Sequence, residues 1–250
     1  MFPKLPDSIL RGLFLLVFLL LWQLVAMLLA SSMLPSPLAV LSNAHEHLVQ
    51  GSLLSDLGIT LLRVSVSFLI AMLIGTALGV LMGSFHSWDT LLDGMLILSL
   101  NIPALVTIIL CYVWFGLTET AAIVAVALNK IPTVIVTVRE GARAVDRQLM
   151  QVAEVYHLSR WKMLSKVFLP QLYPYFIAAA RNGLALIWKI VLVVELLGRS
   201  NGVGFELGTF FQFFDIQSIL SYTFAFALVV FAIEAFLMRP LEQRFSRWRK

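Results

Sequence analysis

Two lysines, Lys130 and Lys189, lie near the middle of long apolar runs at about 120–138 and 175–197. A lysine at the centre of a membrane helix costs about 2.5–3.5 kcal/mol on insertion scales, so each charge needs compensation. Asn182 precedes Lys189 by seven residues and shares its helical face, whereas Glu195 follows by six and points elsewhere. Other spans must therefore supply any ionic partner.

Two interpretations of these lysines are open. In the first, Lys130 and Lys189, doubled by a second copy of the chain, create a positive potential that attracts an anionic solute. In the second, they form structural ion pairs or extend their long side chains into water-filled gaps. The acidic candidates for such pairs are Glu119, Glu195 and Glu234.

Two further polar features are weaker. Pro103, beside Asn101, interrupts an apolar run and removes a backbone hydrogen bond, which predicts a kink or hinge that lines a pathway. His45 and His47 have i, i+2 spacing, which directs their imidazoles apart on a helix. We therefore expect no metal site.

The composition is that of an integral membrane protein. Of the 250 residues 60% are hydrophobic and only 13% are charged, whereas about a quarter of the residues in an ordinary soluble domain are charged. About 20 apolar residues cross a bilayer as a helix. The sequence predicts an all-α membrane domain covering residues 1–250, with six spans at about 12–30, 59–82, 92–115, 120–138, 175–197 and 219–238.

The basic residues gather in three segments that six spans would place on one side. Because cations favour the cytoplasmic side, we expect both termini and the segment between the fourth and fifth spans to be cytoplasmic. This bias explains the net charge of +4 more simply than nucleic-acid binding. The three groups are Lys4 and Arg11; Arg139, Arg143, Arg147, Arg160, Lys162 and Lys166; and Arg239, Arg244, Arg247, Arg249 and Lys250.

Two outward-facing segments and one glycine pattern complete the organisation. Residues 39–54 are expected to form an amphipathic helix near the outer surface, and the glycine- and phenylalanine-rich segment 198–218 a re-entrant or interfacial helix. Gly75, Gly79 and Gly83 put three small positions on one helical face. Such a face allows close packing, either within the chain or between subunits.

The central segment, residues 139–173, is the most informative part of the chain. Val145, Leu149, Val152 and Tyr156 follow helical spacing and predict an amphipathic helix. Ser159 is a suitable N-cap for a second short helix. The apolar face of that helix is formed by Trp161, Leu164 and Phe168, and we expect Pro170 and Pro174 to end it. An apolar stripe on a solvent-facing loop indicates a partner protein.

The central segment resembles the cytoplasmic loop of membrane permease subunits from binding-protein-dependent ABC importers. That loop carries E-A-A-x-x-x-G, followed by an apolar residue, any residue and Leu-Pro. Aligning Leu169 and Pro170 puts Gln151 at the Glu, Ala153 at the second Ala and His157 at the Gly. Since glycine permits the turn between the two helices, His157 must adopt an unfavourable φ or reshape that turn.

The resemblance covers nearly the whole chain and is strongest to the nitrate, sulfonate, taurine and bicarbonate branch. Its other marks are Leu62-Arg63, Asn101-Ile102-Pro103, Trp114-Phe115-Gly116, residues 141–146 and Glu195. The resemblance implies a type I ABC importer permease of the bacterial plasma membrane. It would form, as a homodimer, the pathway for a small anionic solute.

The same resemblance implies partners and roles for particular residues. Two ATPase subunits would bind the central segment and would hold ATP and Mg, since the chain contains no G-x-x-x-x-G-K-[ST] pattern. An extracytoplasmic binding protein would deliver the solute. The expected docking residues are Val152, Ala153, Glu154, Tyr156, His157, Leu158, Ser159, Arg160 and Trp161. The candidate pathway residues are Asn101, Pro103, Lys130, Asn182, Lys189 and Glu195.

Other classes of protein fit less well. An ion-coupled secondary transporter would use the lysines and glutamates within the spans as coupling sites, but the sequence shows no inverted repeat and does carry the elaborate central segment. An enzyme would need a convergent set of catalytic groups at membrane depth, which the pattern does not provide. Association with a separate nucleotide-binding subunit distinguishes the ABC permease from the ion-coupled carrier.

Overall fold

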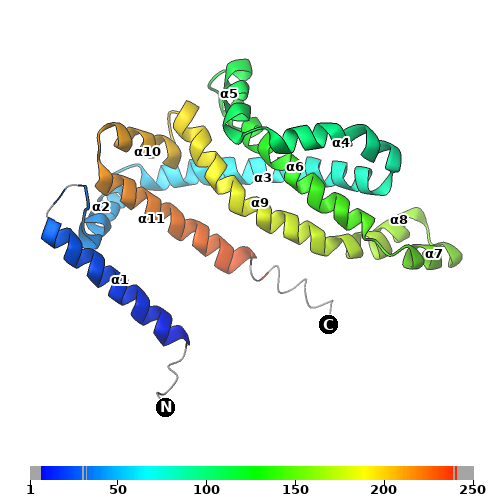
Figure 1. Ribbon diagram of the computed structural model, residues 1–250, viewed down its shortest axis with the longest axis horizontal. Coiled ribbons are helices and arrows are strands. Elements are labelled where there is room, and N and C mark those ends of the chain that lie inside the picture. The colour runs from blue at the N-terminus through cyan, green and yellow to red at the C-terminus, as the bar shows by residue number, and fades with distance from the viewer. Residues whose placement is uncertain (1–6, 30, 32, 239, 241–250) are drawn as a thin grey trace, which may run out of the picture.

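The computed structural model describes residues 7–29, 31, 33–238 and 240, and every regular element in these ranges is helical (Figure 1). The basic residues Lys4, Arg239, Arg244, Arg247, Arg249 and Lys250, and Ala30 at the end of the first expected span, lie outside the described residues. The elements are α1 Asp7–Leu29, α2 Pro37–Val49, α3 Leu53–Ser84, α4 His86–Asn101, α5 Ala104–Phe115, α6 Glu119–Arg143, α7 Arg147–Val155, α8 Arg160–Met163, the π-helical turn η1 Leu164–Phe168, α9 Leu169–Gly198, α10 Val203–Gln212, α11 Ile216–Ile233 and the π-helical turn η2 Glu234–Met238.

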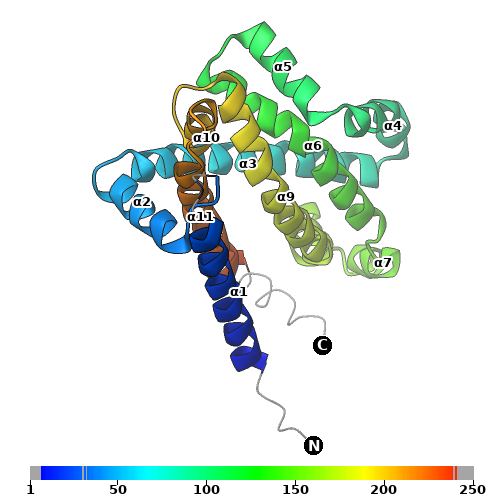
Figure 2. The same ribbon diagram turned by 60° about the vertical axis from the view of Figure 1, so that its left-hand side comes forward.

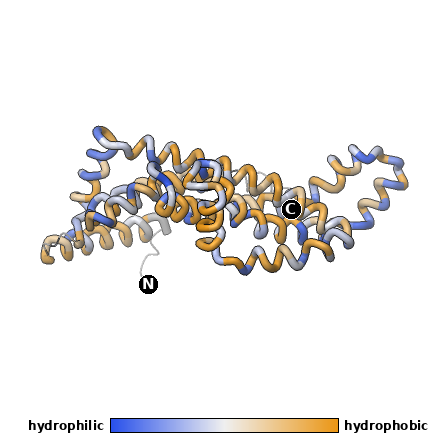
Figure 3. The backbone as a smooth tube through the Cα atoms, turned by 90° about the horizontal axis from the view of Figure 1, so that it is seen from above, coloured by the Kyte–Doolittle hydropathy of each residue, from blue (hydrophilic) through white to orange (hydrophobic). Residues whose placement is uncertain are grey.

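Five stretches of helix in the described part of the chain are long and apolar enough to cross a membrane. They are Gly12–Leu29, Leu53–Ser84, Glu119–Arg143, Arg160–Gly198 and Ile216–Phe236. A sixth crossing results if α4 and α5 together form one span, although they meet at an angle of 99°. Figure 3 shows apolar residues along most of the chain and hydrophilic stretches near the ends of the long axis.

The expected span at 92–115 is therefore broken, and the break lies where Pro103 predicts it. Ile102 is extended, with φ −72° and ψ 124°, and α5 begins directly after Pro103. Proline cannot donate a backbone hydrogen bond and disfavours helical geometry in the residue before it. These two effects end α4 and allow α5 to start in a new direction.

Several expected boundaries were wrong. The outer amphipathic helix ends at Val49 instead of residue 54, and α3 begins at Leu53, six residues before the expected start of its span. Between the expected spans at 59–82 and 92–115 only Phe85, whose backbone is extended, separates α3 from α4. Propensity places such ends poorly because the buried contacts of a neighbouring helix can extend a helix beyond its apolar run.

The glycine face of α3 packs within the chain. A Cβ atom built on Gly75 would lie 2.6 Å from the Val134 side chain, and one on Gly79 would lie 2.8 Å from that of Val138. The backbone of α3 therefore approaches α6 more closely than any larger residue would allow. This agrees with the intrachain alternative for the glycine stripe.

The helices α3, α6 and α9 form the centre of the molecule, and α1 lies beside it (Figure 2). The largest buried cluster contains residues from α3, α5, α6, α9, α10 and α11. Most of α1 is exposed. It touches the rest of the chain through Trp22, whose ring lies 5.8 Å from Phe224 and whose indole N–H donates to the Pro35 carbonyl.

Candidate functional site

The central segment folds into two short helices, as its sequence predicts. The Asp146 carboxylate caps α7 by accepting from the Gln148 amide at 2.8 Å, and the Ser159 hydroxyl accepts from the Lys162 amide at 3.4 Å. Each side chain satisfies an amide that the first helical turn leaves without a partner. The prediction of Ser159 as an N-cap is confirmed.

The turn between α7 and α8 depends on His157 in a left-handed conformation. Its φ is +50°, in the region where glycine is normally found. The Leu158 amide donates to the Ala153 carbonyl at 3.0 Å, and the His157 amide to the Glu154 carbonyl at 2.9 Å, which closes the end of α7. The chain therefore keeps a left-handed residue at this turn, and of the two expected alternatives His157 adopts the unfavourable φ.

The two helices expose an apolar surface. Val152 is 51% exposed, Tyr156 77% and Trp161 73%, and Leu149 and Val155 of α7 are exposed beside them. Ala153, in contrast, is buried. Of the expected docking residues Val152, Glu154, Tyr156, His157, Ser159, Arg160 and Trp161 are exposed, and Leu158 is half-buried.

The expectation that Pro170 and Pro174 end the second short helix was wrong. The helix runs from α8 through η1 into α9, with Pro170 in the first turn of α9 and Pro174 inside it. A π-helical turn changes the hydrogen-bonding register immediately before the prolines.

Both ends of the central segment are fixed to the helical core. The Gln171 amide oxygen accepts from the Asp146 amide at 2.8 Å, so the start of α7 is tied to the start of α9. Gly141 packs against the Tyr175 ring so closely that a Cβ atom would lie 2.5 Å from it. On α4, Asp93 accepts from Arg139 at 2.7 Å. The segment is therefore a rigid projection from α6 and α9.

A second group of polar residues, centred on the buried Arg63 and Glu195, lies at the opposite end of the bundle. We call it the Arg63 cluster, and it consists of Arg63, Glu119, Glu195, Arg199 and Asn201. Arg63 donates two hydrogen bonds to Glu119, at 2.9 and 2.6 Å, and one to Glu195 at 2.6 Å. Arg63 is 2% exposed and Glu195 is fully buried. Such a forked arrangement needs the planar guanidinium of arginine.

The Arg63 cluster also holds the segment before α10. The Asn201 carbonyl accepts from Arg63 at 2.9 Å. Arg199 donates at 2.6 Å to Glu119 and also at 2.6 Å to the Leu117 carbonyl. The first amides of α10 find acceptors on α3 and α9, with Gly202 donating to Asp56, Val203 to Thr60 and Gly204 to Glu195. The segment after α9 is thus fixed to three helices.

The candidate pathway residues do not form one group. Asn101 and Pro103 lie exposed at the bend between α4 and α5, and Glu195 belongs to the Arg63 cluster. Lys130 is 2% exposed and donates to the Thr133 hydroxyl at 2.7 Å. Asn182 and Lys189 share an exposed face of α9.

The expected acidic partners of the two lysines are engaged elsewhere. Glu119 and Glu195 pair with Arg63, and Glu234 lies 3.5 Å from Arg181. Among the residues that the structure describes, no carboxylate lies within ion-pair distance of Lys130 or Lys189. Lys130 thus has a structural role, in which it is buried and hydrogen-bonded to a neutral hydroxyl. The ion pairs with Glu119, Glu195 or Glu234 that this interpretation named do not form.

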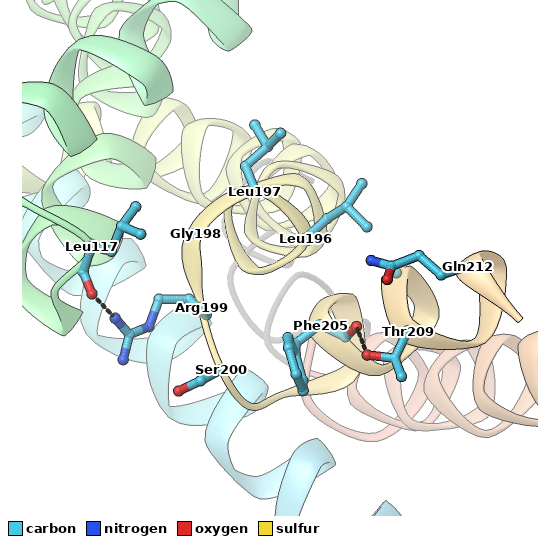
Figure 4. Close-up of a pocket in the computed structure, with 10 residues that line it drawn as sticks. Leu117, Leu196, Leu197, Gly198, Arg199, Ser200, Phe205, Thr209 and Gln212 are labelled. Carbon is cyan, nitrogen blue, oxygen red and sulfur yellow. Dashed lines mark hydrogen bonds between the residues drawn. The ribbon is translucent and has the colours of Figure 1, made fainter.

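A shallow cavity of about 310 Å³ lies beside the Arg63 cluster, between the end of α9 and α10 (Figure 4). Leu196, Phe205 and Gln212 line it. Arg199, the charged residue in its wall, turns toward Leu117, to whose carbonyl it donates. Both terminal nitrogens of Arg199 are therefore engaged within the chain.

Sequence reasoning missed the centre of the Arg63 cluster. It named Glu195 as a pathway residue, and Arg63 only as a mark of resemblance. A signal was present, since an arginine ten residues inside a long apolar helix requires a buried partner. Which carboxylate supplies that partner depends on how α3, α6 and α9 pack, and the local sequence does not contain this information.

These features define a class: a multi-span helical membrane protein that projects a rigid, apolar helix pair from one end. The chain belongs to the family described as the binding-protein-dependent transport system inner membrane component, whose model matches residues 72–247. It is thus an ABC importer permease of the inner membrane, and the permease is not the catalytic component of such transporters.

Relatives with transport names cover most of the chain. A permease named for aliphatic sulfonate transport, SsuC of Bacillus subtilis (strain 168), is 30% identical over 93% of this chain and 85% of its own. The taurine transport system permease protein TauC of Escherichia coli (strain K12) is 27% identical over 93% and 86%. The nitrate import permease protein NrtB of Synechocystis is 26% identical over 91% and 88%.

Solved structures show the same fold. An inward-facing structure of the MetNI methionine ABC transporter superposes with a TM-score of 0.67 at 17% identity. The match covers 78% of this chain and 97% of the other. The expected type I importer fold is confirmed.

Proposed function

We propose that two copies of this chain form the translocation pathway of an ATP-driven importer for a small anionic solute. A separate ATPase would bind the central segment from the cytoplasm, and an extracytoplasmic binding protein would deliver the solute. The observation that supports this proposal most strongly is the exposed apolar surface of α7 and α8, which is fixed to the helical core at both ends of the central segment.

The exposed surface fits a protein partner. Tyr156 and Trp161 are about three-quarters exposed, and large aromatic side chains supply most of the energy in many protein interfaces. They project beyond the helical core with Arg160 and Glu154, which are also exposed. Aromatic anchors among charged residues are typical of the centre and rim of such an interface.

The attachment of the central segment to α6 and α9 explains how a partner could drive transport. Because α8 and η1 continue directly into α9, and the Asp146 amide at the start of α7 binds Gln171 of α9, a displacement of α7 and α8 would be passed to α9. Closure of an ATPase pair would then shift the spans between inward- and outward-facing arrangements. A loosely attached loop would absorb that displacement.

The relatives support the proposed solute class. Three permeases that align with most of this chain are named for sulfonates, taurine and nitrate, and each of these carries an anionic group. The distribution of basic residues supports the proposed orientation, with the central segment and both termini in the cytoplasm.

Uptake by the reconstituted complex tests this function. The chain would be placed in proteoliposomes with its ATPase and binding protein, and uptake of taurine, ethanesulfonate and nitrate would be measured with ATP and with a non-hydrolysable analogue. We expect the complete complex to accumulate at least one of these anions with ATP and none with the non-hydrolysable analogue. Uptake by the chain without an ATPase, driven by a proton or sodium gradient, would contradict the proposal.

A further inference from the structure

The helix α9 has one face that the rest of the chain does not cover. Exposed residues recur along it at the spacing of a single helical face: Ala178, Asn182, Ala185, Leu186, Lys189, Val193 and Leu196. The opposite face, which includes Ala179, Gly183, Ile187 and Val191, is buried against α3 and α6. Asn182 and Lys189 are strongly polar members of the exposed face, and Arg181, which lies at its edge, pairs with Glu234.

Lys189 lies deep within the span. It precedes Gly198, the last residue of α9, by nine residues, which is about 14 Å at 1.5 Å per residue. The hydrocarbon core of a bilayer is about 30 Å thick. The lysine therefore lies near the midplane, and Asn182 lies two turns further toward the central segment.

Lys189 has no hydrogen bond or ion pair with the residues that the structure describes. A lysine in contact with lipid at this depth would cost about 2.5–3.5 kcal/mol on insertion scales. Water in front of this face would remove most of that cost. An exposed, unpaired cation at mid-depth therefore indicates that this face of α9 borders an aqueous space.

Lys130 provides the contrast within the same chain. Its ammonium donates to Thr133, and its side chain lies so close to α9 that a Cβ on Gly183 would be 2.7 Å from Lys130 Cε. The residue is 2% exposed. Lys130 thus has a fixed position between helices, where a passing solute has no access.

We propose that the Asn182 and Lys189 face of α9 lines the aqueous pathway and that Lys189 is the residue that selects for an anionic solute. This inference rests on the proposed function and assigns its charge preference to one of the two lysines. Two copies of the chain would place two Lys189 ammonium groups along one path. A sulfonate, carboxylate or nitrate would interact with them through charge and hydrogen bonding, and Asn182 would offer an amide.

Cysteine accessibility tests the location of this face independently of any substrate. The natural Cys111 is buried, so single cysteines can be introduced at Asn182, Lys189, Lys130 and Leu228 in the full complex. Leu228 is an exposed apolar position on α11. A membrane-impermeant methanethiosulfonate would be applied from both sides, since it reacts with thiols that ionise in water.

We expect reaction at Asn182→Cys and Lys189→Cys and none at Lys130→Cys or Leu228→Cys. Lack of reaction at Lys189→Cys would overturn the proposal, because it would mean that lipid or the second copy covers this face. Reaction at Leu228→Cys at the same rate would overturn it too, since exposure to water would then not distinguish the α9 face.

Transport by lysine variants tests selectivity. Lys189→Met should lower the uptake rate of an anion by about tenfold or more at subsaturating concentration, chiefly through KM, and Lys189→Arg should restore most of it. Lys130→Met, if the complex assembles, should leave KM unchanged. Equal uptake by Lys189→Met and the natural protein would overturn the proposal. If the natural complex transports none of the anions, the proposed function fails, while the cysteine reactions still report on the α9 face.

Discussion

Glu195 of α9 accepts a 2.6 Å hydrogen bond from Arg63 of α3, and both residues are almost completely buried. Removing one partner of such a pair leaves a charge without compensation, at a typical cost of about 3–5 kcal/mol. Glu195→Ala should therefore lower the midpoint of thermal unfolding in detergent and the yield of assembled complex.

Glu119 provides the matched comparison for this pair. It also binds Arg63, but its side chain is half exposed. Glu119→Ala should therefore destabilise the protein less than Glu195→Ala, because water can replace part of the lost interaction. Equal stability of the natural protein and Glu195→Ala would show that the Arg63 cluster does not hold α3, α6 and α9 together.

The close contact of α3 with α6 predicts opposite effects of alanine at two glycines of the same helix. At Gly79 a Cβ would lie 2.8 Å from Val138 Cβ and 2.9 Å from the Ile135 carbonyl oxygen, whereas at Gly58 nothing lies within 4 Å. Gly79→Ala should cost about 1–3 kcal/mol, and Gly58→Ala should be neutral or stabilise α3. Thermal unfolding of both variants measures the difference, and similar midpoints would contradict the packing described.

The positive φ of His157 predicts how substitutions at this position affect the turn between α7 and α8. Because glycine adopts a positive φ without steric cost, His157→Gly should keep the turn and stabilise it by up to about 1 kcal/mol. His157→Val should disrupt it, since a β-branched residue strongly disfavours this conformation. ATPase activity stimulated by the binding protein should be retained in the first variant and fall in the second. Loss of activity in His157→Gly would show that the imidazole itself is required.

Glu206 of α10 predicts a dependence on pH. Its burial, together with the nearby Asp56 carboxylate, raises the pKa of the Glu206 carboxyl above its ordinary value. A raised carboxyl pKa means that folding favours the protonated form, so this contribution to stability is largest in acid and is lost as the pH rises. Glu206→Gln should exceed the natural protein in melting temperature increasingly from pH 5 to pH 8. A constant difference would exclude this origin.

The spans and the central segment could be predicted because their signals are local. Long apolar runs, the cap at Ser159 and the break at Pro103 depend on neighbouring residues, and the structure agrees with each. The 99° bend between α4 and α5 could not be predicted, since proline ends a helix without fixing the direction of the next one.

Contacts between side chains on distant helices could not be predicted from the sequence. Glu195 stood out as a charge in a span, but its partner Arg63 lies 132 positions away. The same applies to Lys130 and Lys189, which look alike in sequence. One is buried against Thr133 and the other is exposed on α9, and only the packing of α6 and α9 separates them.

Site-specific photo-crosslinking can detect the proposed contact between the central segment and an ATPase. A photoreactive amino acid would replace Trp161, which is 73% exposed, and in a control Val113 of α5, which is 72% exposed. After illumination of membranes that contain the whole complex, the Trp161 position should yield a product with an ATP-binding polypeptide, and the Val113 position should not. If the Trp161 position crosslinks to no ATP-binding partner, or is reached by impermeant reagents only from outside the cell, the central segment is not the docking site of an ATPase.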